Sequence, residues 1–392
     1  MSAFVQTSGD KFTIGGEPFY FGGINSYSLF YLPKEDVDSF FQDAAELKTS
    51  VVRTWLFCDG KTYPGGEVII GSKTYWFQDI DPKTGQMYFN DNEETGLGRF
   101  DYVLDSAKRH GVKLIVTLAQ NWAEFGGADV YVDRLSNSKG HLEFFKNPKI
   151  KAQFKNWVSH ALNRVSVYSG LAYKDDPTIM IVELMNEPRC VGSNRDGKFP
   201  QGGDCKVEYI TNWFKEMSDY TRLVDTKHLI GTGDEGFFNH GYFYPEVYSN
   251  VYDGSSGLDF VAISNLPNIN VLGIHSYMNQ WTSTFKEDLF IENTQNWFID
   301  HMKISKQLQK PFYIGEYGVT DPQLRIRSYP KFQKVVLDQG AGGALSWVML
   351  SNSFGQSCKP ANPPTYEFCK NEPGIETFLS SFCSKMLAKS FI

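Results

Sequence analysis

Short runs of apolar residues alternate along the chain with longer segments in which apolar residues recur every three or four positions. The short runs are typical of buried strands, and the longer period is typical of helices that bury one face. Such an alternation predicts a parallel sheet whose strands are joined by helices. We place eight strands, at residues 19–24, 51–54, 114–118, 179–184, 228–231, 271–274, 312–315 and 343–346.

Three helices are the easiest to predict. Apolar residues fall at helical spacing in 34–47, and again from Phe100 to Ala107, where Gly111 ends the helix. A third helix begins at Asn147-Pro148, because proline suits the first turn. Eight strand and helix units predict an α/β fold of the (β/α)8 or TIM barrel type.

The chain contains no internal repeat, low-complexity tract or Pro/Ser-rich linker, which favours a single domain over residues 1–392. Its first stretch, from Phe4 to Pro18, has turn signals at Ser8-Gly9-Asp10 and Gly15-Gly16. These signals predict a β-hairpin, and we expect it to close the floor of the barrel.

Polar and aromatic residues follow the predicted strands directly. In a (β/α)8 barrel these positions converge on one face, where active sites are built. Polar strand ends also occur simply because loops are hydrated, but a set with this much reactive chemistry favours a site. The set comprises Asn25, Arg53, Asn121, Trp122, Asn186, Glu187, Asp234, Glu235, His275, Tyr277, Glu316 and Trp347.

Two of these strand ends carry a carboxylate in a comparable setting. Residues 181–189 read IVELMNEPR and residues 311–318 read PFYIGEYG, so Glu187 and Glu316 each end an apolar strand. Strand alternation places Glu183 deeper, where it would brace the barrel. Cleavage of a glycosidic bond needs two such carboxyls, and a separation of about 5–5.5 Å gives retention of configuration through a covalent intermediate.

The chain resembles glycoside hydrolase family 5, and within it the fungal-type β-mannanase and β-mannosidase subfamily. The resemblance spans nearly the whole chain in order. It departs from the usual pattern at Met185, at Tyr317 and in the loop that holds Cys358 and Cys369. The matching segments are Gly22–Asn25, Val51–Trp55, Asn121-Trp122, Glu183–Arg189, Gly233–Phe238, His275–Tyr277 with Trp281, Gly315–Gly318 and Ser346-Trp347.

This resemblance implies that Glu187 is the acid/base and Glu316 the nucleophile of a retaining mechanism. It further implies that Arg53 and Tyr277 keep the nucleophile ionised, and an adjacent Arg would lower its pKa. His275 would orient the acid/base. The resemblance also implies substrate-binding roles for Asn121, Asn186, Arg189, Glu235 and Trp347. The candidates for stacking on sugar rings are Trp55, Trp122 and Trp281.

The function implied is endo-β-1,4-mannanase activity on mannan or manno-oligosaccharides by double displacement. An exo-acting β-mannosidase with transglycosylation is the alternative, followed by a β-glucan hydrolase and an inactive sugar-binding barrel. The sequence Gly231-Thr-Gly233-Asp-Glu-Gly236 also fits a dinucleotide fingerprint, but the residues after it show no helical period, so an NAD-dependent enzyme is disfavoured.

Composition excludes several classes of partner. A net charge of −7 with scattered Lys and Arg argues against nucleic acid, and no apolar run is long enough to span a membrane. The seven His residues form no metal-ligand pair, and the proposed chemistry needs no cofactor. We expect a monomer.

Cysteines and the N-terminus bear on compartment. Cys190 with Cys205, and Cys358 with Cys369, could each form a disulfide or stay as free thiols. The first residues lack the pattern of a signal peptide, so we expect an intracellular protein or a secreted one whose signal has been removed.

Overall fold

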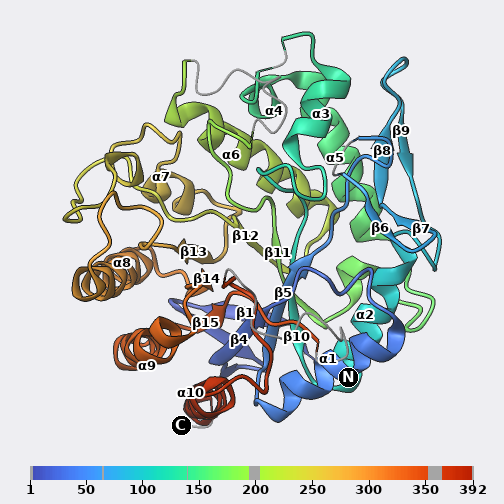
Figure 1. Cartoon of the computed structure of the whole chain (residues 1–392). Coiled ribbons are helices and arrows are strands. Elements are labelled where there is room, and N and C mark those ends of the chain that lie inside the picture. Colours follow the sequence, from blue (N-terminus) through green and yellow to red (C-terminus); the bar gives the residue numbers. More distant parts are fainter. Residues whose placement is uncertain (1–2, 64–65, 139, 194–203, 352–363, 391–392) are drawn as a thin grey trace.

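Eight parallel strands form one sheet that curls into a barrel (Figure 1). The computed structural model describes residues 3–63, 66–138, 140–193, 204–351 and 364–390. Hydrogen bonds link the strands in the order β12, β11, β10, β5, β4, β15, β14, β13. Their bounds are β4 (Phe21–Asn25), β5 (Val51–Trp55), β10 (Lys113–Thr117), β11 (Ile179–Glu183), β12 (Leu229–Gly231), β13 (Leu272–Ser276), β14 (Phe312–Tyr317) and β15 (Gly343–Ser346).

Asn270, just before β13, joins the two ends of this order. Its backbone N–H donates to the carbonyl of Ile230 at 2.9 Å, and its side-chain Oδ1 accepts the N–H of Ile230 at 2.9 Å. The predicted eight-stranded barrel is therefore confirmed, and each predicted strand overlaps an observed one.

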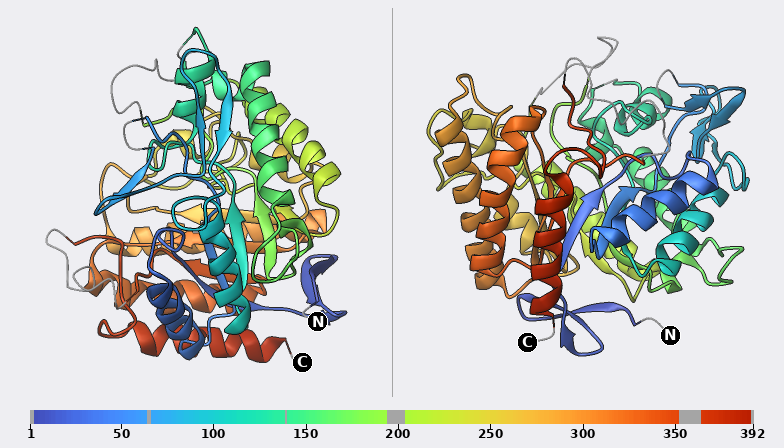
Figure 2. Two further views of the ribbon diagram at one scale, coloured as in Figure 1. Left: turned by 90° about the vertical axis from the view of Figure 1, so that its right-hand side faces the viewer. Right: turned by 60° about the horizontal axis from the view of Figure 1, so that its bottom comes forward.

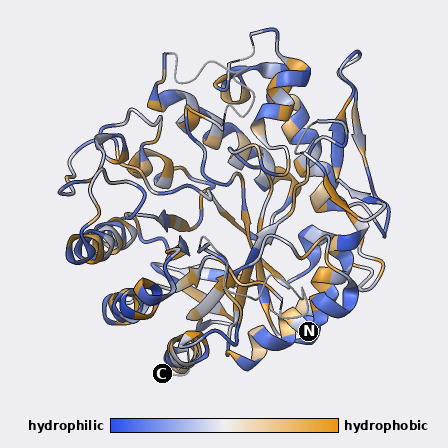
Figure 3. Ribbon diagram, in the orientation of Figure 1, coloured by the Kyte–Doolittle hydropathy of each residue, from blue (hydrophilic) through white to orange (hydrophobic). Residues whose placement is uncertain are grey.

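Helices surround the barrel and turn apolar positions towards the strands, as the orange and blue faces in Figure 3 show. All three predicted helices are present, and the Asn147 side chain caps α5 by accepting the N–H of Lys149 at 2.9 Å. The bounds are α1 (Lys34–Glu46), α2 (Gly98–Arg109), α3 (Ala128–Leu135), α4 (Glu143–Lys146), α5 (Pro148–Asn163), α6 (Val207–Val224), α7 (Phe260–Ser264), α8 (Glu287–Leu308), α9 (Pro322–Gln339) and α10 (Ile375–Lys389).

The N-terminal segment lies across the barrel end opposite the long loops, at the bottom of the right-hand view in Figure 2. It has three short strands rather than two: β1 (Val5–Ser8), β2 (Lys11–Ile14) and β3 (Glu17–Pro18). Val5 and Phe12 are buried with barrel residues, and the Phe12 ring lies 6.4 Å from that of Tyr313. The predicted closure of the barrel floor is confirmed.

The connection between β5 and α2 was not predicted in detail. It contains two antiparallel pairs, β6 (Val68–Ile70) with β7 (Lys73–Tyr75), and β8 (Gln78–Ile80) with β9 (Met87–Phe89). Their strands are only three residues long, so alternation leaves too short a signal.

One alternative function, dinucleotide binding, loses support from the fold. Residues 237–248, which follow the Gly-rich fingerprint, contain no helix, so the dinucleotide interpretation lacks the element it requires. Among the described helices, none combines the length and apolar character needed to cross a membrane.

Candidate active site

The two predicted carboxylates meet at the carboxyl ends of the strands. Glu316 is the last residue but one of β14, whereas Glu187 lies in the turn after β11. One carboxylate oxygen of each, together with a ring nitrogen of His275, falls within 4.8 Å of the others. This separation suits a retaining glycosidase, because inversion needs roughly 6.5–9.5 Å for a water molecule.

Glu316 is held by two strong donors. Arg53 Nη1 donates to its Oε1 at 2.6 Å, and the Tyr277 hydroxyl donates to its Oε2 at 2.5 Å. All three side chains are buried. Hydrogen bonds of this kind, to an ionised acceptor, are stronger than neutral ones.

Arg53 itself is fixed from below by a buried network. Its Nε donates to Glu183 at 2.8 Å and its Nη2 donates to Asn186 Oδ1 at 2.7 Å. Glu183 also accepts from Thr117 at 2.7 Å and from Tyr313 at 2.6 Å. The prediction that Glu183 braces the barrel is confirmed, and its charge compensates the buried guanidinium.

Glu187 has different surroundings. The Trp122 indole N–H donates to its Oε2 at 2.6 Å, and Nδ1 of His275 lies 2.7 Å from its Oε1. Burial lowers the pKa of His275 well below its usual range, so this ring is neutral. The backbone at Glu187 has φ of 50°, a left-handed conformation that costs a non-glycine residue free energy and is common at functional sites.

A hydrogen-bonded chain holds the turn that carries Glu187. Asn121 Oδ1 accepts the backbone N–H of Arg189 at 3.0 Å, and His141 Nε2 lies 2.9 Å from the same oxygen. His141 Nδ1 in turn lies 3.1 Å from Asp129. The resemblance implied that Asn121 contacts substrate. Asn121 is instead fully buried and is not among the residues that line the cleft, so its role is to hold the turn.

A disulfide holds the same turn from its other side. Cys190 is bonded to Cys205, and its backbone N–H donates to Ser256 at 2.8 Å. The sequence left open whether Cys190 and Cys205 form a disulfide or remain free thiols, and the structure shows the disulfide. The other candidate pair includes Cys358, which lies outside the described residues.

Burial dominates the titration of the two carboxyls. It raises the pKa of Glu316 to about 8 against the lowering effect of Arg53, and repulsion from ionised Glu187 adds to the rise. Burial also raises the pKa of Glu187. Arg53 does lower the pKa of Glu316, as expected, but desolvation outweighs the ion pair and the net shift is upward.

The two carboxyls titrate as a pair, since each charge disfavours the other. With a proton on Glu187 the repulsion is absent, and the donors Arg53 and Tyr277 then favour the charge on Glu316. The pair can thus supply one acid and one carboxylate at the same time.

A cleft of about 980 Å³ opens over the pair. Trp55 and Trp281, expected as exposed stacking residues, are only 2% and 7% exposed but do face the cleft. Arg53 and His275 lie behind its wall. The lining residues are Tyr27, Trp55, Gln120, Trp122, Glu124, Phe125, Asn186, Glu187, Arg189, Glu235, Tyr248, Asn250, Tyr277, Gln280, Trp281, Glu316, Trp347 and Tyr366.

Several of these lining residues were missed from the sequence. Tyr27 and Gln120 stand three and two residues past predicted strand ends and could have been found by extending that criterion. Tyr248, Gln280 and Tyr366 come from long loops, for which strand position gives no signal.

Arg189 and Glu235 form an ion pair in the cleft wall. Both Nε and Nη2 of Arg189 donate to the Glu235 carboxylate, and the guanidinium lies 5.3 Å from the Trp122 ring centroid. Burial raises the pKa of Glu235 to about 7. The pair therefore presents a polar edge beside an aromatic surface, which is the chemistry that a sugar ring requires.

The atoms of Glu187, His275 and Glu316 also form the single cluster in the described part of the chain that could hold a metal ion. Their carboxylate oxygens already accept hydrogen bonds from Arg53, Tyr277 and Trp122. A guanidinium directly beside Glu316 disfavours a second cation there.

A paired acid and carboxylate across an aromatic cleft, at the carboxyl face of a (β/α)8 barrel, define the class of retaining glycoside hydrolases. A family model described as GH family 5 beta-mannosidase-like matches residues 2–339. The chain belongs to glycoside hydrolase family 5.

Similar proteins agree with this assignment. Mannan endo-1,4-beta-mannosidase 7 of Arabidopsis thaliana is 32% identical over 90% of this chain and 79% of its own length. Mannan endo-1,4-beta-mannosidase F of Aspergillus fumigatus is 31% identical over 94% of this chain and 74% of its own. The crystal structure of an endo-1,4-beta-mannanase from Rhizomucor miehei is 37% identical, covers 99% of this chain and 100% of that one, and has a TM-score of 0.85.

Proposed function

We propose that the chain hydrolyses β-1,4-mannosidic bonds within mannans and manno-oligosaccharides, with Glu316 as nucleophile and Glu187 as acid/base. The observation that carries this proposal is a pair of carboxyls with one oxygen of each within 4.8 Å of the other, of which only Glu316 accepts a hydrogen bond from a guanidinium. Proteins at 31–37% identity over most of this chain bear the name of that activity.

In the first step the Glu316 carboxylate attacks the anomeric carbon while the bond to the leaving oxygen breaks. Glu187 gives its proton to that oxygen, which departs as a sugar hydroxyl. Arg53 and Tyr277 stabilise the ionised Glu316 before the attack. The carboxylate loses its charge as the new ester bond forms, and its hydrogen bonds to these two donors weaken. Trp122 and His275 hold the Glu187 carboxyl in position for the transfer.

In the second step Glu187, now ionised, takes a proton from water. The water oxygen attacks the anomeric carbon from the side that the leaving group vacated, and the bond to Glu316 breaks. Two inversions give net retention, and Glu187 recovers its proton. Another sugar hydroxyl in place of water would give transglycosylation.

The shape of the cleft favours attack within a chain. Its lining residues follow strands on both arcs between β11 and β14: Trp55 and Trp347 on one arc, Glu235 and Trp281 on the other. Within the described residues, the cleft therefore has binding surface on both sides of the two carboxyls, which supports binding of a polymer across them.

The test is the product pattern from polymeric mannan and from mannotetraose, for the native chain and for Glu187→Ala and Glu316→Ala. We expect a rapid fall in mannan viscosity that either substitution abolishes. Accumulation of mannose with little loss of viscosity would instead establish an exo-β-mannosidase. If neither substrate is cleaved, the mannan assignment fails and β-glucans are the next substrates to assay.

We propose further that the chain acts as a monomer in an oxidising compartment. The Cys190–Cys205 disulfide supports this location, since such bonds rarely persist in the cytosol. Alkylation of the protein taken from its native source, with and without reduction, tests it: a protein that reacts fully without reduction would contradict the location. Sedimentation tests the monomer.

A further inference from the structure

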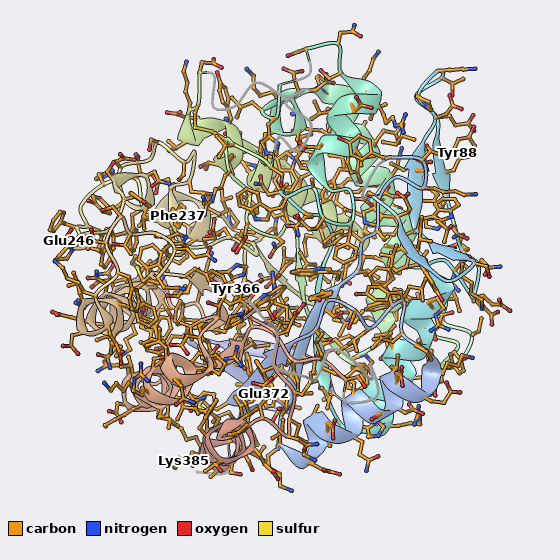
Figure 4. All side chains as sticks on the ribbon, viewed as in Figure 1. Tyr88, Phe237, Glu246, Tyr366, Glu372 and Lys385 are labelled. Atoms are coloured by element: carbon orange, nitrogen blue, oxygen red, sulfur yellow. A yellow bond between two sulfur atoms is a disulfide. The ribbon has the colours of Figure 1, made fainter. Side chains whose placement is uncertain are left out.

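A segment near the C-terminus, residues 365–368, lies against the barrel mouth although it falls beyond the part of the chain that the family model matches. It runs beside the residues that follow β15. Phe368 N donates to Val348 O at 3.0 Å, and Leu350 N donates to Phe368 O at 2.9 Å. Figure 4 labels Tyr366 near the centre of the view, over the barrel.

A buried arginine of α9 fixes this segment. Arg325 is 1% exposed, and its Nη2 donates to the carbonyls of Thr365 and Val319, each at 3.2 Å. Its Nη1 donates to Glu372 at 3.2 Å. A charged donor with this many acceptors is costly to displace, so the segment has a defined position relative to β14.

Tyr366 packs on the side chain that holds the nucleophile. Its ring meets that of Tyr277 edge to face, with centroids 5.4 Å apart and planes at 83°. The contact is tight: a Cβ added at Gly318 would lie 3.0 Å from Tyr366 Cδ1 and 3.3 Å from Tyr277 Cε1. Tyr366 therefore limits the movement of the hydroxyl that donates to Glu316.

The same segment contacts the cleft walls on both of its flanks. Gln280 donates to the Tyr366 hydroxyl, and Tyr27 donates to Glu367 Oε1 at 2.8 Å. Tyr27, Gln280 and Tyr366 all line the cleft. These contacts join the loops after β4 and β13 across the end of β14.

We infer that Tyr366 has two roles in the proposed reaction: it positions Tyr277 against the nucleophile, and it forms the wall that binds sugars on the glycone side of the scissile bond. The nucleophile attacks the glycone sugar, whereas the acid/base contacts the leaving aglycone. Tyr366 lies against Tyr277 and the β14 end, which places it on the glycone side. This inference rests on the proposed function.

The two roles predict different effects of two substitutions. Tyr366→Ala removes the ring, so Tyr277 donates less effectively and the pKa of Glu316 rises; the acid limb of the kcat/KM profile moves to higher pH. Its kcat/KM should fall about two- to tenfold, the range expected for one aromatic contact. Tyr366→Phe keeps the ring and loses the Gln280 bond, so the acid limb should stay in place.

The second readout is the choice of bond in mannopentaose labelled at its reducing end. Loss of glycone contacts in Tyr366→Ala should shift cleavage towards the non-reducing end, so that fewer sugars need to bind on the weakened side. Tyr366→Phe should show a smaller shift in the same direction. Tyr88→Ala, an exposed tyrosine on the β8–β9 hairpin, is the matched control and should change neither readout.

Thermal unfolding of each variant checks that it folds. If Tyr366→Ala does not fold, the cleavage pattern of Tyr366→Phe still tests the wall role. A folded Tyr366→Ala with an unchanged acid limb overturns the positioning role, and an unchanged cleavage pattern overturns the wall. If the native chain leaves mannopentaose and mannan intact, the proposed function has failed and this inference falls with it. An active native chain with unaltered variants sinks the inference alone.

Discussion

The two carboxyls of the site are held by opposite means. Glu316 belongs to a barrel strand and accepts from a guanidinium that is itself tied to Glu183. Glu187 lies just beyond its strand, in a left-handed conformation, and both of its hydrogen-bond partners, Trp122 and His275, are neutral. Arg189 lowers the pKa of Glu187 electrostatically, but its guanidinium is hydrogen-bonded to Glu235. One side is built around charge and a rigid strand, and the other around a turn held by surrounding contacts.

This difference matches the two tasks. A nucleophile must be ionised and aimed at one carbon, so a fixed cation and a strand serve it. An acid/base must release and regain a proton, and a cation beside it would hold it ionised. Substitutions on the Glu316 side should therefore have the larger effect on the free energy of unfolding. On the Glu187 side, activity should depend on the contacts of the surrounding loops.

Removing each carboxyl breaks the comparison most directly. Glu316→Ala should lower kcat for mannotetraose by about 10⁴-fold or more, since loss of a nucleophile disables the whole catalytic unit. Glu187→Ala should lower it by roughly 10²–10⁴-fold, the usual contribution of acid/base catalysis. A dinitrophenyl β-mannoside, whose leaving group needs no proton, separates the two.

On that substrate Glu187→Ala should still release dinitrophenol in a rapid first turnover, whereas Glu316→Ala should release none. Glu292→Ala, an exposed glutamate on α8, is the control and should behave as the native chain. Equal losses for both variants on the activated substrate would contradict the assigned division of roles.

Arg53 is the next point of contrast, because no guanidinium donates a hydrogen bond to Glu187 in the way that Arg53 donates to Glu316. Arg53→Lys keeps the charge, but one ammonium cannot reach Glu183, Glu316 and Asn186 together. We expect a loss in kcat of about 10²–10³-fold, as for removal of a preorganised donor. Arg53→Ala should also destabilise the fold by roughly 3–5 kcal/mol, because it leaves buried carboxylates uncompensated.

Kinetics and chemical unfolding measure the two effects. Arg327→Lys is the matched control, since Arg327 donates through Nε and Nη2 to the Glu287 carboxylate on the surface. A similar loss in both Lys variants would show that the position of Arg53 has no special importance.

The fold was predictable because the barrel strands carry a strong local signal. Apolar runs such as 312–315 are continuous and end in a polar residue, and β14 appears there. The catalytic pair followed from the same criterion. The exact surroundings did not, since Asn121 and Trp122 are adjacent in sequence yet only Trp122 reaches the cleft.

The remainder depends on long-range packing. Asp129 lies in the first turn of α3 and His141 lies just before α4, and they reach the catalytic turn through Asn121 only because of how these helices pack. The pKa of Glu316 is a further case: the sequence showed the neighbouring arginine but not the degree of burial that outweighs it.

Tyr277 sharpens the comparison through pH. Its hydrogen bond lowers the pKa of Glu316, so Tyr277→Phe should raise that pKa. The ionised nucleophile is lost as pH falls, and the acid limb of kcat/KM should move to higher pH by about one to two units, since a bond to a charged group is worth about 1.5–3 kcal/mol. Profiles from pH 4 to 9 check this, and a shift to lower pH would contradict it.

Tyr317→Phe is the paired control for Tyr277→Phe. Tyr317 follows Glu316 in β14, but its hydroxyl accepts from Gln333 on α9 and does not contact the nucleophile. Its acid limb should stay where it is in the native chain.

The smallest expected effect tests the claim that loop contacts matter on the Glu187 side. The Cys190–Cys205 disulfide closes a loop with a sequence separation of 15, which is worth about 3 kcal/mol in the chain-entropy account. Cys190→Ser with Cys205→Ser should lower the free energy of unfolding by about that amount. Because Cys190 lies three residues after Glu187, kcat for mannotetraose should also fall by a few-fold.

First-turnover release from the dinitrophenyl β-mannoside should be unaffected by this double substitution, because that step does not need the proton of Glu187. Reduction of the native chain with dithiothreitol should reproduce the loss in kcat. Any further change that dithiothreitol causes in the double variant would report on Cys358 and Cys369. If the double variant slows both substrates equally, the disulfide acts on the whole site, and the contrast between its two sides does not extend to this bond.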